Sequence, residues 1–278
     1  IRAPNEALCK GLIQHMRLIS LRVRGLVSAA KQGLIDWIAS KDADIVCLQD
    51  IRVREYKIID DPRFCPPGLS PFYFEGDEEH RGGVAIWTRA TPKAVMRGLG
   101  GYDVDLDGRY IQADFDTVSI VSVLPPSPWE PDSAAQRQAF MDALAVWMKK
   151  IRKKRRHFIF CGDFGIAHRT LDLEEWHKHN ESPGFRREDR AWLDEILTQH
   201  GYLDAFREVS ATEAAYSWFP DQQVFGLANP GGWRTDLQLV SAELKRSIQS
   251  AAYVSKRPFD DRAPLIVDYD LDLEPPES

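Results

Sequence analysis

The stretch FIFCGDFGIAHRTLDL, residues 158–173, decides how the chain is organised. Its first residues are aromatic or apolar, and they run into Gly162, Asp163 and a second glycine, Gly165. A short apolar run bounded by glycine is typical of a buried strand. The pattern predicts a strand over 157–161 that ends by placing the Asp163 carboxylate in a loop. The rest of any site around this carboxylate should come from other strand ends.

Strand-like and helix-like segments alternate on both sides of this stretch, in two similar halves. Helices are expected over 28–40, 133–152 and 188–200, where apolar residues recur at helical spacing. Two mixed sheets packed face to face, with helices outside, would accommodate this order. The other expected strands are RLISLRV (17–23), DIVCLQD (44–50), FYFEG (72–76), GGVAIWTR (82–89), RYIQADFD (109–116), VSIVSVL (118–124), DLQLV (236–240), AAYV (251–254) and PLIVDYD (264–270).

Composition indicates a globular domain. The 278 residues contain no polar spacer that would separate two domains, so we expect a single domain over 17–273. Residues 1–16 are expected to form an N-terminal extension, for which a disordered state is one alternative. The net charge of −6 argues against a general attraction to nucleic acid but allows local basic patches. No apolar run approaches the ~20 residues of a membrane-spanning helix. The four cysteines form no CxxC pair, which favours a reducing cytoplasm over a disulfide framework.

Acidic residues recur at the ends of expected strands. If the sheets align, these ends could meet in one crevice, where carboxylate oxygens are the ligands that Mg²⁺ prefers. Acidic residues at strand ends are also common turn formers and helix caps, and spacing alone favours that interpretation. The residues concerned are Asp50 in LQD, Asp163 in GDF, Asp236 in WRTDLQL and Asp261 in DDRAPL.

Several motifs together carry a resemblance to a known family. LQD, GGVAIWTR, GDF, RAWLDEIL with GYLDAFRE, YSWF, WRTDLQL and DDRAPL occur in the order found in exonuclease III-type enzymes. The chain thus resembles the endonuclease/exonuclease/phosphatase superfamily over roughly residues 17–273. The resemblance implies a four-layer α/β sandwich. It also implies Mg²⁺-dependent hydrolysis of phosphate esters in a cleft at the top of the sheets.

Aligned with that family, the site has lost several of its residues. Asp163, Asp236 and Asp261 remain, and Asp163 stands where the family keeps the carboxylate that activates or orients the attacking water. The replaced positions are Arg22 and Arg24 for two asparagines, Asp50 for a metal-binding glutamate, Leu124 for a phosphate-contacting tyrosine, Gly165 for the asparagine of GDxN and Arg262 for a histidine.

Arg22 is the replacement with the largest expected effect. A guanidinium about 5 Å from a divalent ion costs roughly 6–7 kcal/mol at an effective dielectric constant near 20. The same side chain could pair with Asp50 or Asp163 and take the place of the metal. Alternatively, Arg22, Arg24 and Arg262 could bind phosphate without a metal, because guanidinium forks match phosphate oxygens. Internal pairing is the favoured alternative, so we expect no cofactor and little hydrolysis.

Long segments are similar to one non-enzymatic branch of the superfamily, the bacterial catabolite repression control proteins. These segments are 108–127, 183–210 and 263–270. The similarity implies a translational regulator that acts with the RNA chaperone Hfq on A-rich mRNA. The chain departs from the branch in keeping Asp163. The alternative is a weak Mg²⁺-dependent exodeoxyribonuclease or abasic-site endonuclease, acting on DNA through Asp163, Asp236 and Asp261.

The run KKIRKKRRH (149–157) is the strongest local concentration of positive charge. It could bind RNA phosphates or an acidic partner. Cations at a helix C-terminus also suit the helix dipole, and the two interpretations are equally supported. We expect the run at the edge opposite the carboxylates, and Trp129 at an exposed loop tip. The basic residues are Lys149, Lys150, Arg152, Lys153, Lys154, Arg155 and Arg156.

Overall fold

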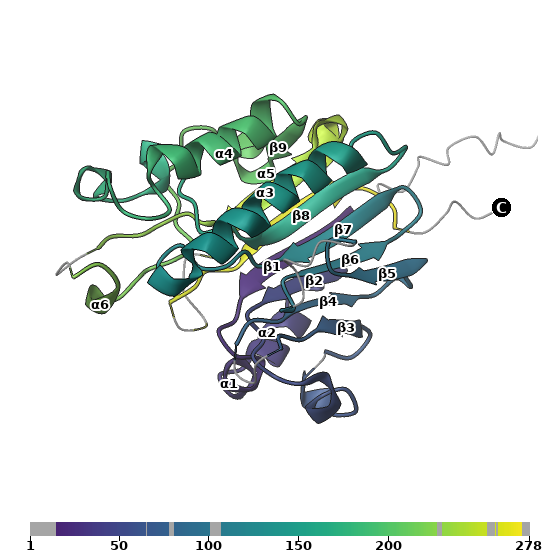
Figure 1. The fold of residues 1–278 in the computed structure, drawn as a ribbon. Helices are drawn as coiled ribbons and strands as arrows, with labels where there is room; N and C mark the ends of the chain where they lie inside the picture. The colour runs from purple at the N-terminus through teal and green to yellow at the C-terminus, as the bar shows by residue number, and fades with distance from the viewer. Residues whose placement is uncertain are drawn as a thin grey trace, which may run out of the picture.

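The computed structural model describes residues 15–64, 66–77, 81–100, 107–226, 230–254, 259 and 261–273. Its centre consists of two six-stranded sheets (Figure 1). The first has the order β11-β12-β1-β2-β4-β3, made of β1 (His15–Arg22), β2 (Ile45–Gln49), β3 (Ser70–Phe74), β4 (Val84–Thr88), β11 (Ile248–Tyr253) and β12 (Leu265–Asp270). The second has the order β5-β6-β7-β8-β10-β9, made of β5 (Ala94–Arg97), β6 (Tyr110–Asp114), β7 (Val118–Val123), β8 (His157–Asp163), β9 (Tyr202–Asp204) and β10 (Asp236–Ser241).

Helices cover the outer faces of both sheets. They are α1 (Leu26–Lys31) and α2 (Leu34–Ala39) on the first sheet, and α3 (Ala134–Ile151) and α4 (Arg187–Thr198) on the second. Two short helices lie elsewhere. α5 (Ala205–Val209) contributes to the core between the sheets, and α6 (Gln222–Phe225) packs on a separate cluster around Trp218 and Trp233. In Figure 1, α3 lies along β8, while α1 and α2 lie on the opposite side of the molecule. No helix in the described ranges is both long and apolar enough to cross a membrane.

β8 shows how the sequence produces this layering. Successive side chains of a strand point to opposite faces. Ile159 and Cys161 therefore join the core between the two sheets, while Phe158 and Phe160 join the core beneath α3 and α4. All four side chains are fully buried. A strand buried on both faces explains why this stretch is continuously apolar instead of alternating.

The expected fold, a four-layer α/β sandwich of two mixed sheets flanked by helices, is confirmed. The single helix expected over 28–40 is wrong, because Gly33 adopts φ 91° and separates α1 from α2. β8 continues to Asp163, two residues beyond its expected end at 161, so this carboxylate belongs to the strand and not to a loop. β1 begins at His15, so residues 15 and 16 of the expected N-terminal extension belong to the first sheet, while residues 1–14 of that extension lie outside the described residues.

Candidate functional site

Sheet pairing brings the ends of several strands to one end of the sandwich. β1 and β2 run parallel, so Arg22 at the end of β1 lies beside Gln49, which immediately precedes Asp50. In the other sheet, β8 and β10 run antiparallel with Asp163 directly opposite Asp236. Gln49 Nε2 donates to Ser122 Oγ over 2.9 Å and links the two sheets at this level. The structure thus gathers the acidic strand ends that the sequence singled out.

Arg22 lies between two of these carboxylates. Its Nη1 donates to Asp163 Oδ2 at 2.9 Å, and its Nη2 donates to Asp50 Oδ2 at 3.0 Å. The guanidinium side chain is only 14% exposed, while the two acidic side chains are 3% and 1% exposed. Burial alone would lower the pKa of Arg22, but the charges of Asp50 and Asp163 outweigh it and raise that pKa. The cation is therefore held in its charged form by two acids that it bridges.

Asp50 has a second arginine that sequence reasoning missed. Arg52 Nε and Nη2 donate to the two Asp50 oxygens, both at 2.8 Å, in a bidentate pair. Both residues have positive φ, 61° and 52°, a conformation that few residues other than glycine adopt. Burial would raise the pKa of Asp50, but Arg22 and Arg52 together lower it. The only signal in the sequence was the position of Arg52 two residues after LQD.

Arg262 bridges two carboxylates of the second sheet, as Arg22 bridges Asp50 and Asp163. Its Nη1 lies 2.9 Å from Asp163 Oδ2 and 3.2 Å from Asp236 Oδ2. The guanidinium carbon also lies 4.9 Å from the centre of the Trp218 ring, within the range of a cation–π contact. Burial acts to raise the pKa of Asp163, yet Arg262 and Arg22 lower it well below its usual range. Asp163 is thus an ionised carboxylate held by two cations.

Asp236 is the carboxylate of the group whose negative charge is least well compensated. It lies opposite Asp163, and its Oδ1 is buried with no hydrogen-bond partner within the described part of the chain. Burial, and then repulsion from Asp163, raise the pKa of Asp236 to about 6, against a partial offset from Arg262. A pKa raised above the unfolded value of ~3.9 means that ionising Asp236 opposes folding.

The change Asp236→Asn is expected to stabilise the protein at pH 8 by on the order of 3 kcal/mol, because asparagine mimics the protonated acid. The penalty that it removes is fully present above the folded pKa of about 6. It disappears as the pH falls below ~3.9, the unfolded value. Urea unfolding of both proteins at pH 8 and pH 4 measures the difference. A variant less stable than the parent at pH 8 would contradict the assigned repulsion.

Asp261 is also paired. Its Oδ2 accepts from Arg24 Nη1 at 2.9 Å and from Trp218 Nε1 at 2.8 Å. Its Oδ1 is buried and lacks a hydrogen-bond partner among the described residues. The Arg24 side chain is 42% exposed, so the Arg24–Asp261 pair lies between the buried carboxylates and solvent. Arg24 also has a positive φ of 50°.

Leu124 and Gly165 frame the group without contributing a polar side chain, although the Gly165 amide donates to Asp163 Oδ1 at 3.0 Å. Leu124 follows β7 and belongs to the core between the sheets, where it is 3% exposed. Gly165 has φ 64°, and a Cβ atom there would lie 2.8 Å from Pro128 Cδ. A side chain at this position would require the Pro128 loop to move. The expected asparagine position is therefore closed by packing.

The basic run lies at the far end of β8 from Asp163, as expected. Two of its residues are engaged within the chain: Arg152 pairs with Glu243 at 2.6 Å, and Arg156 donates to the carbonyl of Phe115 at 2.7 Å. The prediction for Trp129 is wrong, because its ring is tilted by 44° against that of Trp218 with 4.1 Å between the ring centres, and its Nε1 donates to Pro183 O at 2.9 Å. The remaining basic residues, Lys149, Lys150, Lys153, Lys154 and Arg155, are exposed.

A second buried charge cluster lies next to β10 and consists of Arg234, Arg207, Asp172 and Asp204. No sequence motif pointed to it. Arg234 is completely buried and donates from Nε to Asp172 Oδ1 at 2.6 Å. Its Nη2 lies 2.7 Å from Asp204 Oδ2. Arg207 also pairs with Asp172. Burial and these arginines oppose each other, and the net result is a pKa of about 2 for Asp172. The cluster fixes the backbone that carries Asp236.

The site residues do not fit the Mg²⁺ ion that the family resemblance implies. That ion needs an octahedron of oxygen ligands at about 2.0–2.1 Å. Both oxygens of Asp50 are occupied by arginine, and Asp163 accepts from the Gly165 amide at 3.0 Å as well as from Arg22. Within the described ranges, no group of three or more His, Cys, Asp or Glu residues is placed to share a metal ion.

Comparison with known proteins agrees with this architecture. The Exodeoxyribonuclease of Bacillus subtilis is 27% identical over 253 residues, covering 90% of this chain and 98% of its own length. The DNA repair nuclease APEX1 of Danio rerio is 28% identical over 242 residues, covering 84% of this chain and 76% of its own.

The solved structure of an AP endonuclease from Archaeoglobus fulgidus superposes with a TM-score of 0.80 at 22% identity, over 92% of this chain and all of that one, and so shares the fold. The sequence pattern of the Endonuclease/Exonuclease/phosphatase family matches residues 20–255. The chain, similar over most of its length to exonuclease III-type and AP endonucleases, therefore belongs to the endonuclease/exonuclease/phosphatase family.

Proposed function

We propose that this chain is a non-hydrolytic member of its family, in which arginine side chains replace the catalytic metal. The observation that carries the proposal is the position of Arg22, which donates to both Asp50 and Asp163 across the two sheets. A divalent ion between these acids would lie within a few ångströms of that guanidinium. The resulting repulsion is roughly 6–7 kcal/mol at 5 Å and an effective dielectric constant near 20.

A second candidate is a Mg²⁺-dependent exodeoxyribonuclease or abasic-site endonuclease. The names of the relatives favour it, since they are an exodeoxyribonuclease and a DNA repair nuclease. Asp163, Asp236 and Asp261 would carry the reaction, with DNA as substrate. Against it, each of these carboxylates is paired with an arginine. The geometry thus supports the first candidate, and the relatives' names support the second.

A cleavage assay separates the two candidates. Purified protein is incubated with a duplex that contains one abasic site and a recessed 3′ end, in Mg²⁺ and separately in Mn²⁺. The first candidate predicts no metal-dependent product above that of Asp163→Ala, because no metal is positioned near the scissile phosphate. Metal-dependent cleavage that is lost in Asp163→Ala would establish the second candidate.

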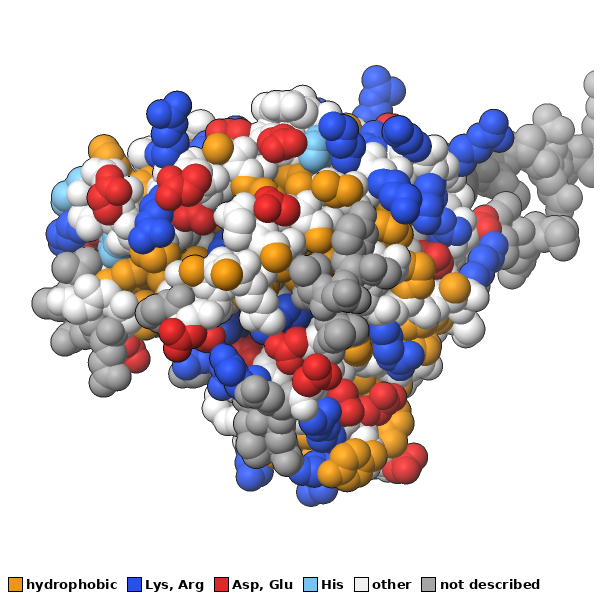
Figure 2. Space-filling model, viewed as in Figure 1, with side chains coloured by type: hydrophobic (Ala, Val, Ile, Leu, Met, Phe, Trp, Pro, Cys, Tyr) orange, Lys and Arg blue, Asp and Glu red, His pale blue; other side chains and the backbone are white. Residues whose placement is uncertain are grey.

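For the biological role we propose a translational regulator that acts with the RNA chaperone Hfq on A-rich mRNA. It rests on the resemblance to catabolite repression control proteins that the sequence alone indicates for segments 108–127, 183–210 and 263–270, whereas the relatives found by comparison are nucleases. Exposed cations also gather beyond α3, where Figure 2 shows Lys and Arg side chains at the upper right. Such a patch is the electrostatic footprint of a nucleic-acid-binding surface.

Removing two of these cations is expected to weaken binding to A-rich RNA in the presence of Hfq. We choose Lys153→Ala with Lys154→Ala, because both are exposed and neither is in an ion pair in the described structure. Each lost phosphate contact should reduce the slope of log K against log salt by roughly 0.7. The matched control is Lys31→Ala with Lys57→Ala, two exposed positions on the opposite side of the molecule. An unchanged slope in the first variant would remove the basic run from the interface.

A further inference from the structure

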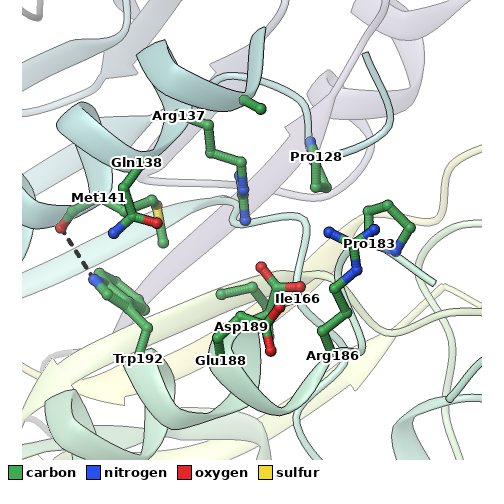
Figure 3. A pocket seen from close by; sticks show the side chains of 11 residues that line it. Pro128, Arg137, Gln138, Met141, Ile166, Pro183, Arg186, Glu188, Asp189 and Trp192 are labelled. Atoms are coloured by element: carbon green, nitrogen blue, oxygen red, sulfur yellow. Dashed lines mark hydrogen bonds between the residues drawn. The ribbon is translucent and has the colours of Figure 1, made fainter. Parts of the chain in front are cut away.

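A cavity of about 260 Å³ opens between α3 and α4, beside the loop that follows β8 (Figure 3). None of the paired carboxylates described above lines it. Its walls are partly apolar, with Met141, Ile166 and Trp192 on one side and Pro128 on the other. Trp192 Nε1 donates to the Met141 carbonyl at 3.0 Å, which fixes the indole ring against the wall.

Arg137 forms the polar floor of the cavity. Its side chain enters from α3 and points into the space (Figure 3), and the residue is only 7% exposed. Nη1 donates to Pro126 O at 2.7 Å and Nη2 donates to Phe164 O at 2.9 Å, so both hydrogen bonds go to neutral carbonyls. In the described part of the chain Arg137 has no ion pair. Burial lowers its pKa to about 10, only partly offset by the more distant Asp189 and Asp163.

A buried cation without a neighbouring anion is costly, and a bound anion would relieve that cost. The guanidinium fork suits a planar carboxylate. The opposite wall carries acid instead: Asp189 on α4 is half-buried, and its Oδ2 accepts from the Gly184 amide at 2.9 Å. The second oxygen of Asp189 is left to accept from a ligand. Glu188 and Arg186 line the same rim, so the four charged side chains sum to zero.

We propose that this cavity binds a small zwitterion, an α-amino acid with an apolar side chain. The carboxylate would pair with Arg137, the ammonium group would donate to Asp189, and the side chain would pack on Met141 and Trp192. A net-neutral ligand matches a lining whose charges cancel, whereas phosphate groups would meet repulsion from Glu188 and Asp189. The volume lies below the about 300–1,000 Å³ of pockets for drug-sized ligands, which suits a single amino acid and not a nucleotide.

Calorimetry with matched probes tests the proposal on the full chain. L-Leucine, L-methionine and L-phenylalanine are titrated first, and at least one is expected to bind with a Kd below about 10 mM. Leucinamide lacks the carboxylate, and 4-methylpentanoate lacks the ammonium group, while both keep the side chain of leucine. Each should bind at least about tenfold more weakly than leucine. Absence of binding by all three amino acids, or equal binding of leucine and either analogue, would overturn the proposal.

Two variants locate the binding without touching the fold-supporting contacts of Arg137. Asp189→Asn keeps an oxygen for the Gly184 amide, so the loop is retained. It should weaken the binding of leucine, which loses the acceptor for its ammonium group. It should leave 4-methylpentanoate bound at least as tightly as in the parent, because a negative charge that repels its carboxylate is removed. Gln138→Glu, at an exposed position on the rim, should weaken leucine and 4-methylpentanoate alike by placing a negative charge near their carboxylates. Unchanged leucine binding in both variants would place the ligand elsewhere and refute the site.

Discussion

Replacing Arg234 by methionine is expected to destabilise the fold by about 3–5 kcal/mol, the usual cost of breaking a buried ion pair from one side. Arg234 is completely buried and is paired with Asp172 at 2.6 Å and with Asp204 at 2.7 Å. Methionine fills much of the same space but leaves Asp204 as a buried, uncompensated charge. Asp172 keeps its pair with Arg207. Urea unfolding at pH 7 measures the loss.

The matched control is Arg152→Met, which removes an arginine from a more exposed pair with Glu243. Pairs of this kind contribute about 0.2–1 kcal/mol, so the control should remain close to the parent. Adding Asp204→Asn to the Arg234 variant should recover part of the lost stability, because the uncompensated charge is then gone. If the Arg234 variant lost no more stability than the control, the buried cluster would not hold β10 in place.

The fold was predictable because its signals are local and repeated. The apolar run 158–161, bounded by glycine, predicted a buried strand, which the structure shows to be buried on both faces, and the amphipathic period of 133–152 matches α3. The signals were weakest where elements are short. β5 and β9 have four and three residues, and the helix pattern over 28–40 concealed the break that Gly33 makes at φ 91°. Pattern periods need longer windows than these elements provide.

The site was predictable in its residues but not in its pairings. The acidic strand ends could be identified along the chain, and so could Arg22, but which arginine meets which acid depends on contacts between sheets. Asp163 and Asp236 are neighbours only because β8 pairs with β10 in one register. Arg52 carried no motif, and its role follows from the positive φ that turns it back onto Asp50. Such backbone conformations are rare for side-chain-bearing residues, so sequence patterns seldom indicate them.

The double change Arg22→Asn with Arg262→His is expected to convert a metal-insensitive protein into one that Mg²⁺ stabilises. Without metal, the variant should lose about 3–5 kcal/mol, because Asp163 and Asp236 lose the cations that compensate them. At a Mg²⁺ concentration about 100-fold above its Kd, binding would restore about 2.7 kcal/mol. Thermal unfolding with and without Mg²⁺, and calorimetric titration of Mg²⁺, measure both effects. The parent protein should respond only as it does to NaCl of equal ionic strength.

The comparison with a third protein decides what causes the response. Adding Asp163→Asn to the double variant removes the carboxylate that both arginines share, so its Mg²⁺ response should vanish if the ion occupies the place of the guanidinium groups. A parent protein that Mg²⁺ stabilises as strongly as the double variant would mean that the arginines leave the carboxylates readily. The family's hydrolytic chemistry would then remain accessible, and the second candidate function would replace the first. A double variant that binds no Mg²⁺ would instead show that Arg52, still bidentate on Asp50, is sufficient to exclude the ion.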